Sequence, residues 1–210
     1  ILPSCITPSK TVMRHPAPEK TFMFVMHLFT TKVCEDVSCR EAQGTFLGSG
    51  FSVAVDDNST WGITAGHVCE PKEFADTSQL QVMHSGNPHT AEVVAIIKEI
   101  DICVFNVSGI RLPTVTPSSS ELLPGEKVFA LATPSGIYGP NLLPRFEGYY
   151  SGFTGEIPAP EGRGFSFKTL DAYTIPARPG SSGGPVFNGD GELVGMIIMA
   201  RPEFQSFALS

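Results

Sequence analysis

Short β-prone runs separated by turn residues recur along the whole chain, and this pattern constrains the fold more than any other feature. Turn sequences such as Asp56-Asp57-Asn58-Ser59 and Asn188-Gly189-Asp190-Gly191 lie between them. With 18 prolines, 21 glycines and only 17% charged residues, the composition favours many strands over a helical bundle. The predicted strands cover residues 21–29, 43–55, 60–65, 79–84, 90–97, 101–107, 127–133, 145–154, 164–175, 185–188 and 192–199. We therefore expect an all-β fold.

Residues 109–125 divide the strands into two sets, because this segment contains three prolines and three successive serines without an apolar period. Two closed barrels of about six strands each leave no exposed sheet edge, so we expect two six-stranded antiparallel Greek-key β-barrels. The predicted domains are an N-terminal extended arm (1–21), a first barrel (22–108), an inter-barrel linker (109–125) and a second barrel with a C-terminal tail (126–210). Within the first barrel, residues 34–40 are expected to form a polar bend.

Charge and hydropathy exclude several kinds of partner. The formal net charge is −7, and only 14 residues are Lys or Arg, so we expect no nucleic-acid partner. No run approaches the length of a membrane span, and the proline-rich start lacks the apolar core of a signal peptide. We expect a soluble chain. The sequence does not decide its compartment, because an extracytoplasmic or secreted protein and a virus-encoded protein are all compatible with it.

Cysteine and histidine patterns predict no metal and no cofactor. The chain lacks an H-E-x-x-H motif. Cys34, Cys39 and Cys69 are only a weak candidate set of zinc ligands, so we favour structural cysteines or free thiols at these positions. The total of five cysteines leaves at least one unpaired in a monomer. Cys34 and Cys39 are close enough to staple a hairpin tip, and a reduced pair is equally compatible.

The glycine-rich segment 179–186 (PGSSGGPV) is the first candidate for chemistry. Such a turn directs backbone N–H groups toward one point beside a serine hydroxyl, as acyl transfer through an anionic tetrahedral intermediate requires. A serine nucleophile also needs a histidine base held by a carboxylate. His67 alone among five histidines follows a strand within small residues, and Asp101 opens an apolar strand. We therefore predict His67, Asp101 and Ser182 as a catalytic set.

Residues 180–184 also fit the G-x-S-x-G nucleophile elbow of α/β-hydrolases. That fold places its aspartate and histidine after the serine, yet no histidine follows Ser182. Pro185 would moreover disrupt the helix that must begin there. The esterase interpretation is therefore rejected.

Five segments together resemble the trypsin-like (chymotrypsin-fold) serine proteases, and are most similar to Deg/HtrA-type and viral members. They are GSGF at 48–51, ITAGHV at 63–68, DICVF at 101–105, GSSGGP at 180–185 and LVG at 193–195. The resemblance covers roughly residues 22–200. It implies a double barrel with the site in the cleft between the barrels. It also implies His67 as general base, Asp101 as its orienting partner, Ser182 as nucleophile, and the N–H groups of Gly180 and Ser182 as the oxyanion hole.

The departures from the family pattern carry information. Ser181 stands where digestive members carry an aspartate that pairs with a newly cut N-terminus, so that form of activation is not expected and Ile1 need not be an activating terminus. Cys69 lies one position beyond the cysteine of disulfide-bearing relatives, so that bridge is not carried over. The resemblance assigns the specificity pocket walls to Thr174, Ile175, Pro176, Ile198, Met199 and Ala200.

None of these walls carries a negative charge, so cleavage after Lys or Arg is not expected. We predict a serine endopeptidase that acts on proteins or peptides after small or medium apolar residues, with Arg201 leaving an acidic preference open. Two alternatives remain. One is a catalytically silent homologue that acts as a binding module. The other is a processing protease released from a longer precursor, with residues 204–210 as its own former substrate.

Overall fold

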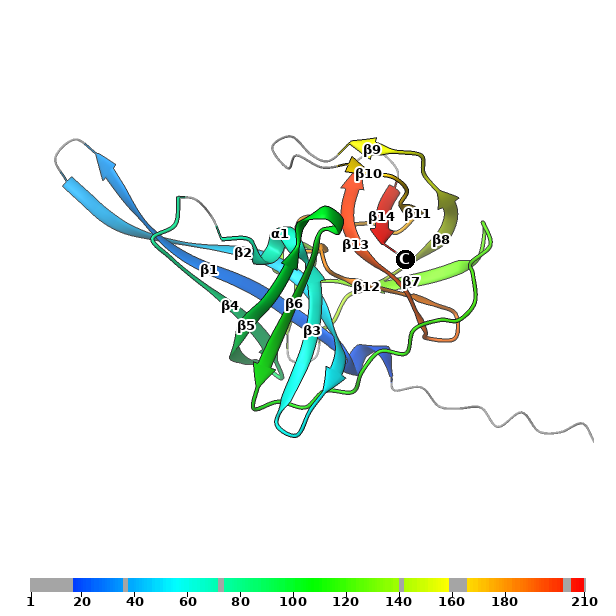
Figure 1. Cartoon of the computed structure of the whole chain (residues 1–210), viewed down its shortest axis with the longest axis horizontal. Coiled ribbons are helices and arrows are strands. Elements are labelled where there is room, and N and C mark those ends of the chain that lie inside the picture. Colours follow the sequence, from blue (N-terminus) through cyan, green and yellow to red (C-terminus); the bar gives the residue numbers. More distant parts are fainter. Residues whose placement is uncertain are drawn as a thin grey trace, which may run out of the picture.

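Six antiparallel strands close the first barrel among the residues that the structure describes. The computed structural model describes residues 17–35, 38–71, 74–139, 142–158, 166–201 and 205–209. The strands of the first barrel are β1 (Phe22–Glu35), β2 (Ser38–Val55), β3 (Ser59–Ala65), β4 (Thr77–His84), β5 (Asn87–Ile97) and β6 (Ile102–Ser108). They are hydrogen-bonded in the order β1-β2-β3-β6-β5-β4 (Figure 1).

A second barrel of six described strands follows. Its strands are β7 (Lys127–Leu131), β8 (Arg145–Phe153), β11 (Asp171–Tyr173), β12 (Pro185–Asn188), β13 (Leu193–Arg201) and β14 (Gln205–Leu209). Taken from β7, the order β7-β8-β11-β14-β13-β12 repeats the connectivity of the first barrel, although no internal repeat is visible in the sequence. The expected pair of six-stranded antiparallel barrels is confirmed (Figure 1).

Short elements lie outside the two barrels. They are the α-helix α1 (Gly66–Cys69), the 3-10 turns η1 (Pro18–Lys20), η2 (Lys98–Ile100) and η3 (Pro134–Gly136), and a small two-stranded sheet of β9 (Ile157–Pro158) and β10 (Ser166–Phe167). None of the described helices is long and apolar enough to span a membrane.

Three sequence expectations need correction. The polar bend expected over residues 34–40 is too long, because β1 and β2 stay paired as far as Glu35 opposite Ser38 and project beyond the barrel (Figure 1). Residues 36 and 37 lie outside the described residues. The strand expected over 164–175 is divided into β10 and β11. Gln205–Leu209 are no tail, because they pair with both β11 and β13 and complete the second barrel. The greater part of the expected arm, residues 1–16, lies outside the described residues.

The core is continuous between the barrels. In β6 the buried residues alternate, so that Cys103, Phe105 and Val107 face the interior with the two-residue period of a strand. The same cluster extends into the second barrel through Phe187 and Ile198, whereas a smaller cluster around Tyr173 fills that barrel alone.

The segment between the barrels is held against both of them. The backbone N–H of Val115 donates to the carbonyl of Ser52 in β2. The Leu193 and Ser118 N–H groups donate to the carbonyls of Thr116 and Leu193, respectively, and thereby tie the segment to β13. These contacts, together with the shared core, fix the two barrels relative to each other.

Candidate active site

Strand register brings the predicted histidine and aspartate to the same end of the first barrel. Ala65, the last residue of β3, pairs with Ile102, the first residue of β6. Gly66 and Asp101 therefore become neighbours, and the Gly66 N–H donates to the Asp101 carbonyl at 2.7 Å. His67 follows in α1, so its ring extends from the barrel end where β6 begins.

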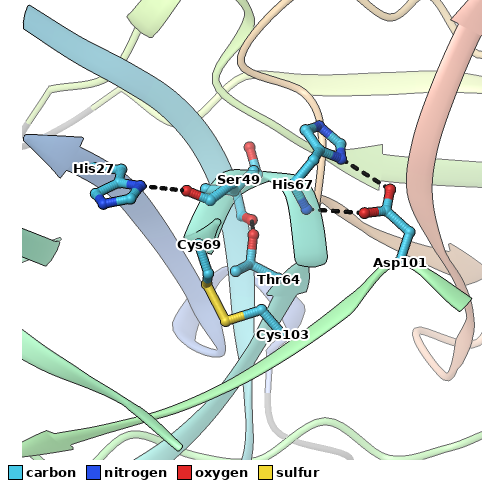
Figure 2. The surroundings of a disulfide bond; sticks show 8 residues. His27, Ser49, Thr64, His67, Cys69, Asp101 and Cys103 are labelled. Atoms are coloured by element: carbon cyan, nitrogen blue, oxygen red, sulfur yellow. Dashed lines mark hydrogen bonds and ion pairs between the residues drawn. A yellow bond between two sulfur atoms is a disulfide. The ribbon is translucent and has the colours of Figure 1, made fainter. Parts of the chain in front are cut away.

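Asp101 holds His67 at two atoms (Figure 2). The backbone N–H of His67 donates to Oδ1 at 2.8 Å, and the ring Nδ1 lies 2.8 Å from Oδ2. An ionised carboxylate only accepts hydrogen bonds, so Nδ1 carries the proton and Nε2 is left as the basic nitrogen. Only 4% of the Asp101 surface is exposed, which protects this pair from competing water.

The backbone around Asp101 is adapted to this contact. Asp101 has a left-handed conformation (φ 53°), which aspartate tolerates better than most residues. A Cβ atom on Gly66 would lie 3.0 Å from Asp101 Oδ1 and 3.1 Å from its carbonyl carbon. Glycine at position 66 thus allows the carboxylate to approach α1 closely.

A disulfide that the sequence analysis missed cross-links the two segments (Figure 2). Cys69, two residues after His67, is bonded to Cys103, two residues after Asp101. The strand register could have revealed this bridge, because the pairing of β3 with β6 places Cys103 opposite Thr64, close to α1. The second bridge, Cys34–Cys39, closes the projecting β1–β2 hairpin. Of the disulfide and the reduced pair that the sequence allowed here, the structure has the disulfide.

The serine loop lies against the first barrel although it belongs to the second. The N–H of Ser49 in β2 donates to the carbonyl of Ser182 at 2.8 Å. A Cβ atom on Gly183 would lie 2.1 Å from the Ser49 carbonyl oxygen and 2.2 Å from Thr64 Oγ1. Ser182 therefore sits beside the end of β3 that leads into His67.

The two N–H groups expected to form an oxyanion hole are those of Gly180 and Ser182. Within the described part of the chain, neither Gly180 N nor Ser182 N donates to an acceptor. Ser181 between them is buried, and its Oγ accepts the Arg178 N–H at 3.2 Å. The position that holds an aspartate in digestive members is thus bonded within its own loop.

The expected specificity walls lie near this loop in sequence but have varied environments. Ile175 is buried with the second-barrel cluster, and Thr174 Oγ1 accepts the Tyr149 N–H at 2.9 Å. Pro176 and Ala200 are exposed, Met199 is half-buried, and Ile198 is buried in the main core. The side chain of Arg201 lies outside the described residues.

Metal ligation finds no support in the described side chains. No group of three or more His, Cys, Asp or Glu residues there could hold a metal ion. Cys34, Cys39 and Cys69, considered above as a weak zinc set, are all bonded in disulfides.

Comparison with curated proteins identifies bacterial serine endoproteases as relatives. A protein named probable periplasmic serine endoprotease DegP-like, from Pseudomonas putida (strain W619), is 31% identical over 166 residues, which cover 75% of this chain and 29% of the relative. The protein of the same name from Ectopseudomonas mendocina (strain ymp) is 32% identical over 162 residues, covering 75% and 30%. The chain thus spans less than a third of the length of these relatives.

Solved structures share the fold. The Rv3671c protease from M. tuberculosis in its active form matches with a TM-score of 0.69 and 18% identity, covering 100% of this chain and 88% of the other. The HtrA-type protease AlgW with decapeptide matches with a TM-score of 0.68 and 16% identity, covering 90% and 60%. At these identities the likeness concerns the fold alone.

A family model described as a trypsin-like peptidase domain matches residues 48–196, which is more than half of the chain. Together with the DegP-like relatives, this match confirms the resemblance to Deg/HtrA-type proteases. The chain therefore belongs to the trypsin-like peptidase domain family.

Proposed function

We propose that the chain is a serine endopeptidase that hydrolyses peptide bonds with a triad of His67, Asp101 and Ser182. The observation that carries the proposal is the double hydrogen bond from His67 to the buried Asp101. The contacts of Ser182 and Gly183 with the neighbouring β2 and β3 support the third member.

Acylation begins when Ser182 Oγ attacks the carbonyl carbon of the scissile bond. His67 Nε2 takes the hydroxyl proton and then donates it to the leaving amine. Asp101 keeps the ring in the tautomer with Nδ1 protonated and stabilises the imidazolium that forms. The product of this step is an ester between Ser182 and the acyl half of the substrate.

The N–H groups of Gly180 and Ser182 would stabilise the negative charge on the carbonyl oxygen in the tetrahedral intermediate. Their lack of acceptors within the described chain leaves them available for that oxygen. Deacylation follows the same path, with water in place of the serine hydroxyl and His67 again as base.

The proposed substrates carry a small or medium apolar residue, such as Val, Ala or Leu, on the acyl side of the cleaved bond. The assigned walls (Thr174, Ile175, Pro176, Ile198, Met199 and Ala200) include no carboxylate that could pair with a buried Lys or Arg. Burying an unpaired cation costs several kcal/mol. Peptides varied at this one position test the proposal, and best cleavage after Lys or Arg contradicts it.

The two disulfides support a location outside the cytoplasm. Disulfides persist in oxidising compartments and are rare where cellular thiols stay reduced. Several relatives are named periplasmic. We infer that the domain folds in an extracytoplasmic compartment.

Digestion of a complex peptide library, followed by mass spectrometry of the products, tests activity and specificity together. The wild-type chain should generate new termini after apolar residues, whereas Ser182→Ala should generate none above background. A wild-type chain that binds peptides without cleaving them would instead support the binding-module alternative.

A further inference from the structure

Ser49 is the one residue of the first barrel whose described contacts reach two carbonyl groups of the serine loop. Its Oγ donates to the Gly180 carbonyl at 2.8 Å, and its backbone N–H donates to the Ser182 carbonyl at 2.8 Å. These two carbonyls belong to the same residues whose N–H groups form the proposed oxyanion hole. Ser49 itself is fully buried in β2.

Hydrogen bonds fix four successive carbonyls of the loop. Besides the two bound by Ser49, the Pro179 carbonyl accepts the Ser135 N–H at 2.7 Å, and the Ser181 carbonyl accepts the Gly184 N–H at 2.9 Å. In a trans peptide the C=O and the following N–H point in opposite directions, and the described chain has no cis peptide bond. The Gly180 N–H therefore points away from Ser135, and the Ser182 N–H points away from Gly184, whereas the two peptides that Ser49 holds carry the N–H groups of Ser181 and Gly183.

A second set of contacts holds Ser49 Oγ in the orientation needed for this donation. Oγ accepts the Thr133 N–H at 3.0 Å and lies 3.2 Å from Thr133 Oγ1. Thr133 is also fully buried, and it immediately precedes the turn that supplies the Ser135 N–H. With one hydrogen on Oγ and Thr133 as a donor to it, the hydroxyl proton is directed to Gly180.

We propose that Ser49 is a positioning residue for the oxyanion hole, acting across the interface between the barrels through the Gly180 and Ser182 carbonyls. This inference rests on the proposed function. The two peptides that Ser49 holds directly follow Gly180 and Ser182, so they help to fix where these two residues lie. Without the Ser49 hydroxyl, the Gly180 carbonyl keeps only the 3.4 Å contact from Thr133 Oγ1, and the position of Gly180, which carries the first N–H of the hole, is held less closely. The hole would then stabilise the tetrahedral intermediate less well, while ground-state binding of the peptide would change little.

The test compares Ser49→Ala with Ser52→Ala, a matched control. Ser52 lies on the same strand, is equally buried, and donates its hydroxyl to backbone carbonyls at Thr21 and Pro113, away from the serine loop. We expect Ser49→Ala to lower kcat by about tenfold or more with KM nearly unchanged. Its labelling by a fluorophosphonate, whose phosphoryl oxygen enters the hole, should slow in parallel. Ser52→Ala should retain wild-type kcat even where its melting temperature falls by the same amount.

A second variant keeps the test decisive if Ser49→Ala folds poorly. Ser49→Cys has a similar size and keeps a weak donor, so its kcat should lie between those of wild type and Ser49→Ala. If the wild-type chain neither cleaves peptides nor reacts with the fluorophosphonate, the proposed function fails and the inference fails with it. If the wild type is active while Ser49→Ala and Ser49→Cys match Ser52→Ala in kcat, the positioning role alone is overturned.

Discussion

Asp101 Oδ1 accepts the backbone N–H of His67 while Oδ2 lies 2.8 Å from the ring Nδ1, so one buried carboxylate fixes both the main chain and the ring of the same residue. The first contact sets where α1 begins relative to β6. The second sets the tautomer. The position and the tautomer of the proposed base therefore depend on a single side chain.

Replacement of Asp101 by Asn tests this dependence. An amide has one acceptor oxygen and one donor nitrogen, so Asp101→Asn can accept only one of the two His67 N–H groups. We expect kcat to fall by about ten-thousandfold, as when the same change forces the wrong tautomer in a triad, with only a modest change in stability. Steady-state kinetics, corrected by counting active sites, measures the loss.

Asp56→Asn is the matched control for Asp101→Asn. Asp56 accepts hydrogen bonds from the Ser59 hydroxyl and the Asn58 N–H in an exposed turn. These hydrogen bonds lower the pKa of the Asp56 carboxyl, but the turn lies at the opposite end of β3 from His67. Its variant should keep full activity, and equal losses from the two substitutions would contradict a specific role for Asp101.

Gly66→Ala should impair catalysis through geometry alone. The added Cβ would lie 3.0 Å from Asp101 Oδ1, so the carboxylate must shift by a few tenths of an ångström. We expect kcat to fall by about tenfold to a hundredfold with KM little changed. Gly189→Ala, where a Cβ meets no atom within 4 Å, provides the control, and equal kinetics for both would argue against the close fit.

The two disulfides should differ in both accessibility and effect. Cys69 and Cys103 are buried beside the site, whereas Cys34 and Cys39 are exposed at the hairpin. Loss of the buried bridge in a Cys69→Ala/Cys103→Ala variant should cost about 2–4 kcal/mol of stability and reduce activity. Loss of the hairpin bridge should cost less, because it closes a shorter loop far from His67.

Thiol trapping with mild reductant should label Cys34 and Cys39 first, with activity retained. Activity should decline only as Cys69 and Cys103 become alkylated. Prompt loss of activity together with hairpin reduction would contradict this order.

His84 should make the fold less stable in mild acid. Burial lowers the pKa of His84, and the nearby His89 lowers it further, so the folded value lies below the ordinary 6.5. Below about pH 6.5 the unfolded chain therefore binds more protons, and the free energy of unfolding decreases as the pH falls through this window. Urea unfolding of His84→Gln should show a weaker loss between about pH 7 and about pH 5 than wild type. An identical pH dependence would exclude this source.

Local patterns in the sequence predicted the barrel strands well, because each strand has apolar residues that must face a core. The outer part of the β1–β2 hairpin could not be predicted in this way. Thr30 is the last residue of β1 that pairs with both β2 and β4, and Thr31 and Lys32 beyond it pair only with β2, so no apolar period marks them. The strand β14 was missed because it is short and its role, closing the second barrel, depends on long-range pairing with β11 and β13.

The site, like the fold, has parts that local sequence patterns predict and parts that they do not. His67 and Asp101 were selectable because each flanks a strand, and the register then brought them together. The Cys69–Cys103 bridge and the contacts of Ser49 carry no local signal, because they arise only when distant segments pack. Contacts between the barrels are therefore the part of the site that sequence patterns leave out.

The central claim is that Ser182 is the nucleophile of an acyl-transferring site, and covalent labelling tests it most directly. Wild-type protein treated with a fluorophosphonate should gain the mass of one phosphonyl group, mapped by peptide sequencing to Ser182. Ser182→Ala should gain none. An unlabelled wild type, or label on a different residue, would contradict the account.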